Sequence, residues 1–257
     1  MKKTLIIIGS ILLVLIIVIG VAVGFYLGPL VKYGIEEIGH KVAKVPVTVD
    51  DVSLSIFSGT ANVKNLRVGN PKGFQTPEAI SVGNVAVSID PMSALSKKVL
   101  VHSILVQSPE ITFEGGLRGN NLNTIAGNAS ATTQNPSEST NASKGPGNKP
   151  APNIEVDDLL ISGAKVHVNL TTLGGKGMTL PLPDIHLTDL GKDSNGMTPA
   201  ELTKAVLDAI TKETVQTVTS NVSQLGKGVH SILGSGQKTV GNGVNSVANT
   251  IGGFFGK

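Results

Sequence analysis

The apolar residues of this chain follow one spacing that occurs six times along the sequence. In each copy, an apolar residue is followed by others two, five and seven positions later. A helical stripe needs intervals of three and four, whereas strand side chains alternate between faces with a period of two. One extra residue in mid-strand, as in a β-bulge, returns the second pair to the first pair's face. The copies begin at Val47, Ala61, Ile80, Val99, Ile154 and Leu180.

Turn-forming residues separate the copies and limit the predicted strands. Gly, Pro and Asn gather between them, as in the segment 69–73. Such short links favour antiparallel neighbours, because a parallel crossover needs a dozen or more residues. We therefore predict an α+β, mainly β fold: a curved antiparallel sheet of bulged strands with one apolar face. The predicted strands are 47–56, 60–69, 79–90, 99–107, 109–114, 153–162, 164–171 and 178–188.

A polar segment divides the predicted sheet into a first part, 46–125, and a second part, 154–190. Residues 126–153 contain hardly any large apolar side chains. Burial could not offset the entropy lost on ordering such a segment. We predict a disordered insertion there.

The N-terminus carries a long apolar run, from Leu5 to Leu27, after two lysines. As a helix this run would extend about 35 Å, enough for a bilayer core of about 30 Å. We predict an uncleaved anchor over residues 1–28, and the alternative is a cleaved signal peptide with Ala22-Val23-Gly24 as its cleavage site. Leaving the short head in the cytoplasm would place residues 30–257 outside.

Two amphipathic segments flank the sheet. Residues 29–45 have Val31, Ile35, Ile38 and Val42 on one helical face, so this helix lies beside the membrane or caps the sheet. Residues 198–257 open with a capping box and are predicted helical to about residue 225. The glycine-rich tail beyond has apolar residues at helical spacing, so it either folds on a bilayer or is disordered in solution.

Composition argues against several function classes. The chain has no cysteine, which excludes disulfides and thiolate metal sites. Its net charge is only +3 and its aromatic content 3%, so binding of nucleic acid is not expected. The five histidines are scattered, without the spacing of a helical zinc site. The acidic doublets at 50–51 and 157–158 occupy a position where other copies carry Lys-Asn or His-Ser, which indicates exposed polarity. We expect no catalytic residue, metal or cofactor, and no enzyme.

The stretch from Val63 to Phe74, VKNLRVGNPKGF, resembles the strand and Asn-Pro-x-Gly-Phe turn of AsmA-like proteins. The turn residues are Asn70, Pro71, Gly73 and Phe74. Strands 80–89 and 99–113 continue the resemblance, which covers residues 1–125 well and 153–190 more loosely. It implies a single-pass protein of the bacterial inner membrane, with most of the chain in the periplasm. It also implies a repeating β-groove, similar to that of chorein-type lipid-transfer proteins, and a role in lipid transport or outer membrane homeostasis.

From these observations we expect a lipid-binding or lipid-trafficking protein without catalysis, with phospholipid acyl chains as its partners. The alternative is a structural or adaptor protein of the envelope, whose sheet is filled by its own side chains and which binds a protein partner. In both cases the apolar face is the decisive feature. The candidate lipid-facing residues are Val82, Val85, Val87, Val101, Ile104, Val106, Leu159 and Ile161.

Overall fold

The computed structural model describes residues 27–55, 57–93, 96–117, 119–142, 144, 150–169, 177–192 and 195–235. The predicted membrane run therefore lies outside the described residues except for its last position. The tail 236–257 also lies outside them. No helix within the described ranges combines the length and apolar character needed to cross a bilayer.

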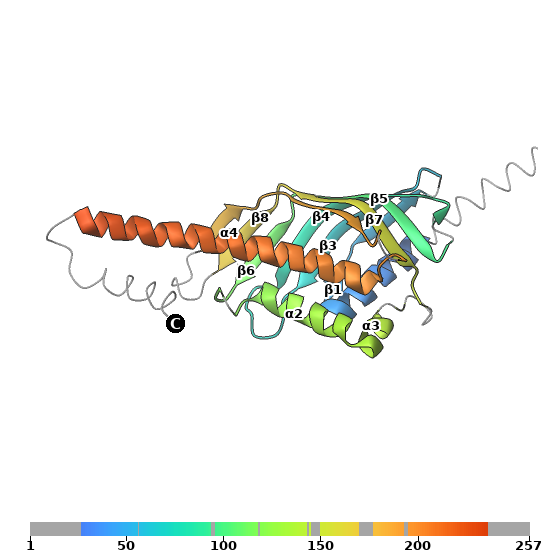
Figure 1. Cartoon of the computed structure of the whole chain (residues 1–257), viewed down its shortest axis with the longest axis horizontal. Coiled ribbons are helices and arrows are strands. Elements are labelled where there is room, and N and C mark those ends of the chain that lie inside the picture. Colours follow the sequence, from blue (N-terminus) through green and yellow to red (C-terminus); the bar gives the residue numbers. More distant parts are fainter. Residues whose placement is uncertain are drawn as a thin grey trace, which may run out of the picture.

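The described residues form one ten-stranded sheet with helices on one side (Figure 1). The helices are an N-terminal one over residues 27–43, α2 (Asn121–Gln134), α3 (Pro136–Ala142) and α4 (Pro199–Ser235). Every predicted strand is present, and those predicted at 47–56 and 178–188 are each divided into two. The strands are β1 (Val47–Thr48), β2 (Asp51–Ser55), β3 (Thr60–Gly69), β4 (Glu78–Ile89), β5 (Lys98–Gln107), β6 (Glu110–Glu114), β7 (Asn153–Ser162), β8 (Lys165–Asn169), β9 (Met178–Pro181) and β10 (Ile185–Leu190).

Several short strands join end to end into longer ones. On β4, Asn84 pairs with Gln107 of β5, and three residues away Ser81 pairs with Glu110 of β6. The pairing register is therefore continuous from β5 into β6. The same continuity links β7 to β8 and β9 to β10. The sheet thus consists of six long strands, and each contains one copy of the apolar spacing.

The extra residue of each copy has two structural outcomes. Between β4 and β5 the register shifts by one residue, as Ser88 pairs with Ser103 and Ile89 with Val101. This shift is the predicted bulge. Between β3 and β4 both strands carry the extra residue, so pairing stays in register past Asn65, whose φ is 50°. In both cases the residues before and after the extra position, such as Val63 and Leu66, pack on the same core.

The prediction of an entirely antiparallel sheet is wrong at one place. β5 pairs with β7, and β6 with β8, in parallel. The chain between β6 and β7 forms α2 and α3, which is long enough to return it to the starting end of the sheet. Parallel pairing is possible there because this connection, unlike the short turns elsewhere in the sheet, is longer than the dozen or so residues that a parallel crossover needs.

The predicted disordered insertion, 126–153, is therefore wrong over most of its length. The side chain of Asn120 caps α2 by accepting a hydrogen bond from the backbone N–H of Asn123 (2.8 Å). Leu122, Ile125 and Ala129 of α2 are buried, and the helix packs against α4. Small side chains suffice for this contact because they let two helices approach closely. The amino-acid composition of this segment did not indicate that its small side chains would be buried between two helices.

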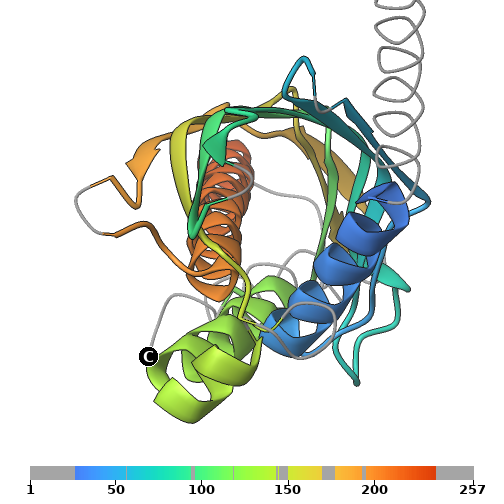
Figure 2. The same ribbon diagram turned by 90° about the vertical axis from the view of Figure 1, so that its right-hand side faces the viewer.

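The sheet curls around α4, with α2 and the N-terminal helix closing the same side (Figure 2). The predicted capping box is present: Thr198 N–H donates to Glu201 (2.7 Å), and Glu201 N–H donates back to the Thr198 hydroxyl (3.2 Å). α4 continues ten residues beyond the predicted end near residue 225. Leu207, Ile210 and Val218 of α4 are buried in the core.

Residues 27–43 form a helix, as predicted for residues 29–45. Its Ile35 and Ile38 pack on the core and Val42 is fully buried. The Glu36 carboxylate accepts a hydrogen bond from the backbone N–H of Val49 (2.9 Å). This helix therefore caps the β1–β2 edge of the sheet.

Candidate functional site

The concave face of the sheet carries apolar side chains in rows that cross the strands. One row runs through paired residues of six consecutive long strands. A second row lies beside it, two residues along each strand. The first row is Leu54, Ala61, Val87, Ile104, Leu159 and Leu187, and the second is Val52, Val63, Val85, Val106, Ile161 and Ile185.

The helices cover this face unevenly. Among the predicted lipid-facing residues, those on β7, a strand that contacts α4, are the most completely covered: Leu159 is 2% and Ile161 1% exposed. Val82, Val85 and Val101 are also buried. Val87, Ile104 and Val106 are only partly buried against the core. These three residues, which we call the accessible patch, lie side by side on β4 and β5.

The opposite face of the same strands carries charged and polar side chains beside a few apolar ones such as Leu105 and Leu160. Exposed histidines pair with carboxylates on neighbouring strands, as His102 does with Asp157 (3.1 Å) and His186 with Asp158. Asp51 lies 3.9 Å from Lys64. Both acidic doublets thus contact polar side chains of neighbouring strands. Among the described residues, no three His, Asp or Glu side chains come close enough to hold a metal ion.

The predicted family-like turn forms a junction at one end of the sheet. The Asn70 side chain donates to the carbonyl of Thr76 (2.8 Å) and to its hydroxyl (2.6 Å). Asn121, at the start of α2, donates to the Asn70 side-chain oxygen (2.8 Å). Gly73 has a φ of 101°, a conformation that suits glycine. The turn is therefore tied to the start of the helical crossover.

Sequence reasoning missed the residue that completes this junction, Glu114. Its side chain is 3% exposed and accepts hydrogen bonds from the backbone of Gln75 (2.5 Å) and Thr76 (2.9 Å) and from the Thr76 hydroxyl (2.5 Å). Burial by itself would raise the pKa of this carboxyl. The hydrogen bonds outweigh burial, so the pKa of Glu114 is lowered from its ordinary value of 4.5. The available signal was a glutamate at the end of the strand, directly after the buried Phe113.

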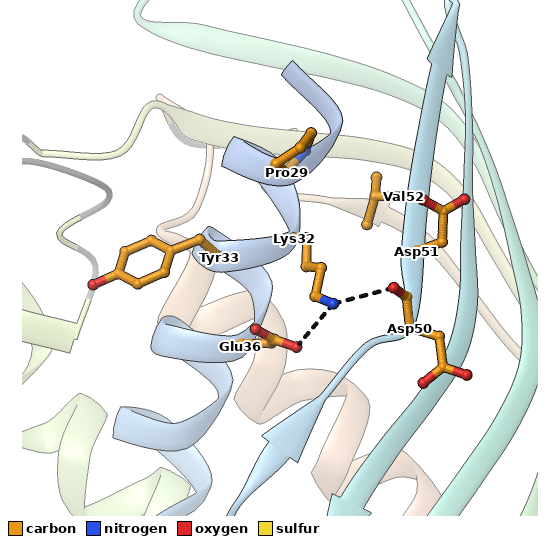
Figure 3. Close-up of a pocket in the computed structure, with 7 residues that line it drawn as sticks. All are labelled: Pro29, Lys32, Tyr33, Glu36, Asp50, Asp51 and Val52. Carbon is orange, nitrogen blue, oxygen red and sulfur yellow. Dashed lines mark hydrogen bonds and ion pairs between the residues drawn. The ribbon is translucent and has the colours of Figure 1, made fainter. Parts of the chain in front are cut away.

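A pocket of about 390 Å³ lies between the N-terminal helix and the β1–β2 edge (Figure 3). Lys32 reaches across it and donates to the backbone carbonyl of Asp50 (3.1 Å). The Asp50 carboxylate accepts from Asn65 (2.7 Å) and Arg67 (3.1 Å). The Asn65 hydrogen bond and the Arg67 charge lower the pKa of Asp50. Lys32 therefore links the helix to the chain between β1 and β2, and the Asp50 carboxylate links that chain to β3.

The chain matches the model of the AsmA family over residues 1–182. This match includes every strand from β1 to β9, and so both strands of the accessible patch and the turn at Asn70. Neither a curated protein nor a solved structure matches the chain.

Proposed function

Because the chain belongs to the AsmA family, we propose that it is a membrane-anchored lipid-binding protein of the bacterial envelope. In this proposal residues 5–27 anchor it to the inner membrane and the described domain lies in the periplasm. Acyl chains of phospholipids contact the concave face at the accessible patch. The protein carries out no chemical step, and its role is to hold or pass on lipid.

The observation that supports this proposal is incomplete covering of an apolar sheet face. A one-sided sheet must bury its apolar face against another element or a ligand. Val87, Ile104 and Val106 keep part of their surface accessible, although every neighbour in their rows is apolar. Transfer of apolar surface out of water is favourable by about 25 cal/mol per Å². An acyl chain is a suitable occupant because it needs no polar partner.

The alternative is a structural or adaptor protein with a self-filled core, and one observation favours it. Val82, Val85, Val101, Leu159 and Ile161, all predicted to face lipid, are buried by the chain itself. In this alternative the accessible patch is an ordinary partly covered edge of the core. A protein partner would then be expected in place of lipid.

Lipid content separates the two functions. The full chain would be purified and its phospholipid extracted and quantified, beside a variant with Val87, Ile104 and Val106 all changed to Thr. The matched control changes Leu105 and Leu160, paired neighbours on the opposite face of β5 and β7, to Thr. We expect near-stoichiometric phospholipid in the wild type and control, and a clear loss in the patch variant. Lipid-free wild-type protein, or equal content in all three, favours the adaptor function.

A further inference from the structure

The described residues carry five exposed large apolar side chains, three on the N-terminal helix and two in turns of the sheet. Phe57 is 82% exposed and Met92 79% exposed, the two highest values. Tyr33 is 52%, Leu30 47% and Val31 38% exposed. We call these five residues the apolar end. Contiguous exposed apolar groups are uncommon on soluble domains and mark contact surfaces.

Phe57 and Met92 belong to two turns that lie against each other. The backbone N–H of Ile89 donates to the carbonyl of Gly59 (2.7 Å). Gly59 has a φ of 63°, and a Cβ at this position would lie 3.0 Å from the ring of Pro91. The β2–β3 turn therefore contacts the chain just before Met92. Both apolar side chains thus extend from the same end of the sheet.

The N-terminal helix begins toward this same end. Along it, Gly39 lies beside Val47, whereas Gly28 lies against the carbonyl of Val52. The helix therefore runs antiparallel to β1 and β2, and its first residues approach the end of β2 that leads to Phe57. Figures 1 and 2 show the start of this helix at the sheet end with the two turns.

The sequence before this helix indicates what covers the apolar end. The apolar run from Leu5 ends at Leu27, the first described residue of the helix. A membrane anchor at 5–27, on which this inference rests, brings the bilayer surface to within a few residues of Leu30 and Tyr33. Aromatic and apolar side chains enter the interfacial region readily. Lys97, exposed in the same loop as Met92, is available to lipid phosphates.

We propose that the apolar end inserts into the interfacial region of the membrane that holds the anchor. Phe57 and Met92 would then lie among lipid headgroups and upper acyl segments. Leu54 and Ile89, each three residues from one of these side chains, are partly accessible and begin the apolar face. Docking in this orientation connects the bilayer to the accessible patch without exposing acyl chains to water.

The test uses the cysteine-free full chain, in which each introduced cysteine is unique. Phe57→Cys and Met92→Cys would be labelled with the fluorophore NBD and reconstituted into phosphatidylethanolamine–phosphatidylglycerol vesicles with or without headgroup-proximal doxyl lipid. Lys72→Cys is the control. Lys72 is exposed in the turn that follows the last residue of β3, whereas Phe57 lies just before the first residue of β3. Because Phe57 and Met92 are so exposed, cysteine there leaves the core packing intact.

We expect blue-shifted emission and strong quenching by doxyl lipid at positions 57 and 92, and neither at 72. Equal quenching at all three positions, or none at 57 and 92, would overturn the proposal. A blue shift without quenching would also overturn it, since a protein would then cover this end. The phospholipid content of the same samples is measured separately. If the quenching experiment contradicts membrane docking, the phospholipid content still tests the proposed lipid-binding function.

Discussion

The Glu114 carboxylate accepts a hydrogen bond from the backbone N–H of Thr76 at 2.9 Å, although 38 positions separate the two residues. This contact joins the end of β6 to the turn that follows β3. Glu114 N–H in turn donates to the Asn121 side chain (2.9 Å), so the start of α2 belongs to the same network. The family-like turn therefore contributes to stability by fixing the start of the crossover.

Replacing Glu114 with Gln should lower the free energy of unfolding by about 1–3 kcal/mol at neutral pH, because one buried backbone N–H loses its acceptor. The lowered pKa means that the charged form contributes fully above the ordinary pKa of 4.5. That contribution is lost as the pH falls through the lower folded-state pKa. Denaturation measured between pH 7 and 3 should thus show the wild type converging on the variant.

Glu110→Gln is the matched control in the same strand. Glu110 is exposed, and its side chain lies 3.7 Å from His167. Loss of such a surface pair should change the free energy of unfolding by less than about 1 kcal/mol. If the two variants behave alike at neutral pH, the carboxylate of Glu114 does not hold the turn.

Ala129→Leu should destabilise the fold by about 1–3 kcal/mol through overpacking, because Ala129 of α2 is fully buried. Ala131→Leu on the same helix should be nearly neutral, since Ala131 is exposed. Thermal unfolding of both variants checks the packed crossover. Equal, negligible effects would instead agree with the disordered insertion expected from composition.

Replacing two glycines of the N-terminal helix with alanine should change the free energy of unfolding in opposite directions. Gly34→Ala should stabilise by about 0.5–1 kcal/mol, because a Cβ there meets nothing within 4 Å and alanine favours helix. Gly28→Ala should destabilise, because its Cβ would lie 2.4 Å from the Val52 carbonyl oxygen. Thermal unfolding of the detergent-solubilised full chain gives both values. Stabilisation by both changes would mean that the helix does not press on β2.

Val87→Asp should cost about 1–3 kcal/mol, whereas Val85→Asp should prevent folding, because only Val85 is buried by the chain itself. Circular dichroism and extracted phospholipid would be measured together. We expect folded Val87→Asp protein with little lipid. Full lipid content in a folded Val87→Asp protein would show that acyl chains do not contact this position.

The strands were predictable from sequence because the spacing within each copy indicates which of its residues lie on the apolar face of the sheet. The spacing placed Val63 and Leu66 on one face despite their offset of three, and burial confirms it, because Val63 belongs to the core and Leu66 packs against that core. The parallel pairing of β5 and β7 was not predictable in this way. The parallel pairing depends on the crossover that contains α2. Ala129 and Thr132 of α2 are buried, and they stabilise this helix only through contact with another element.

The candidate site was predictable only in part. The spacing identified the apolar face, but covering by α4 is a tertiary property that no local pattern encodes. Leu159 and Ile104 are equivalent in the repeat and pair directly, yet only Leu159 is fully covered. The role of Glu114 depends likewise on a turn 38 positions away.

Site-specific photocrosslinking at two adjacent residues of β5 tests lipid binding on the concave face most directly. A photoreactive amino acid would replace Ile104 in one full-length protein and Leu105, which faces the opposite side, in another. After irradiation in cells grown with labelled phosphate, crosslinked phospholipid would be measured on each purified protein. The proposed function predicts labelled lipid at position 104 and little at 105. Equal labelling at both positions, or none at 104, would contradict it.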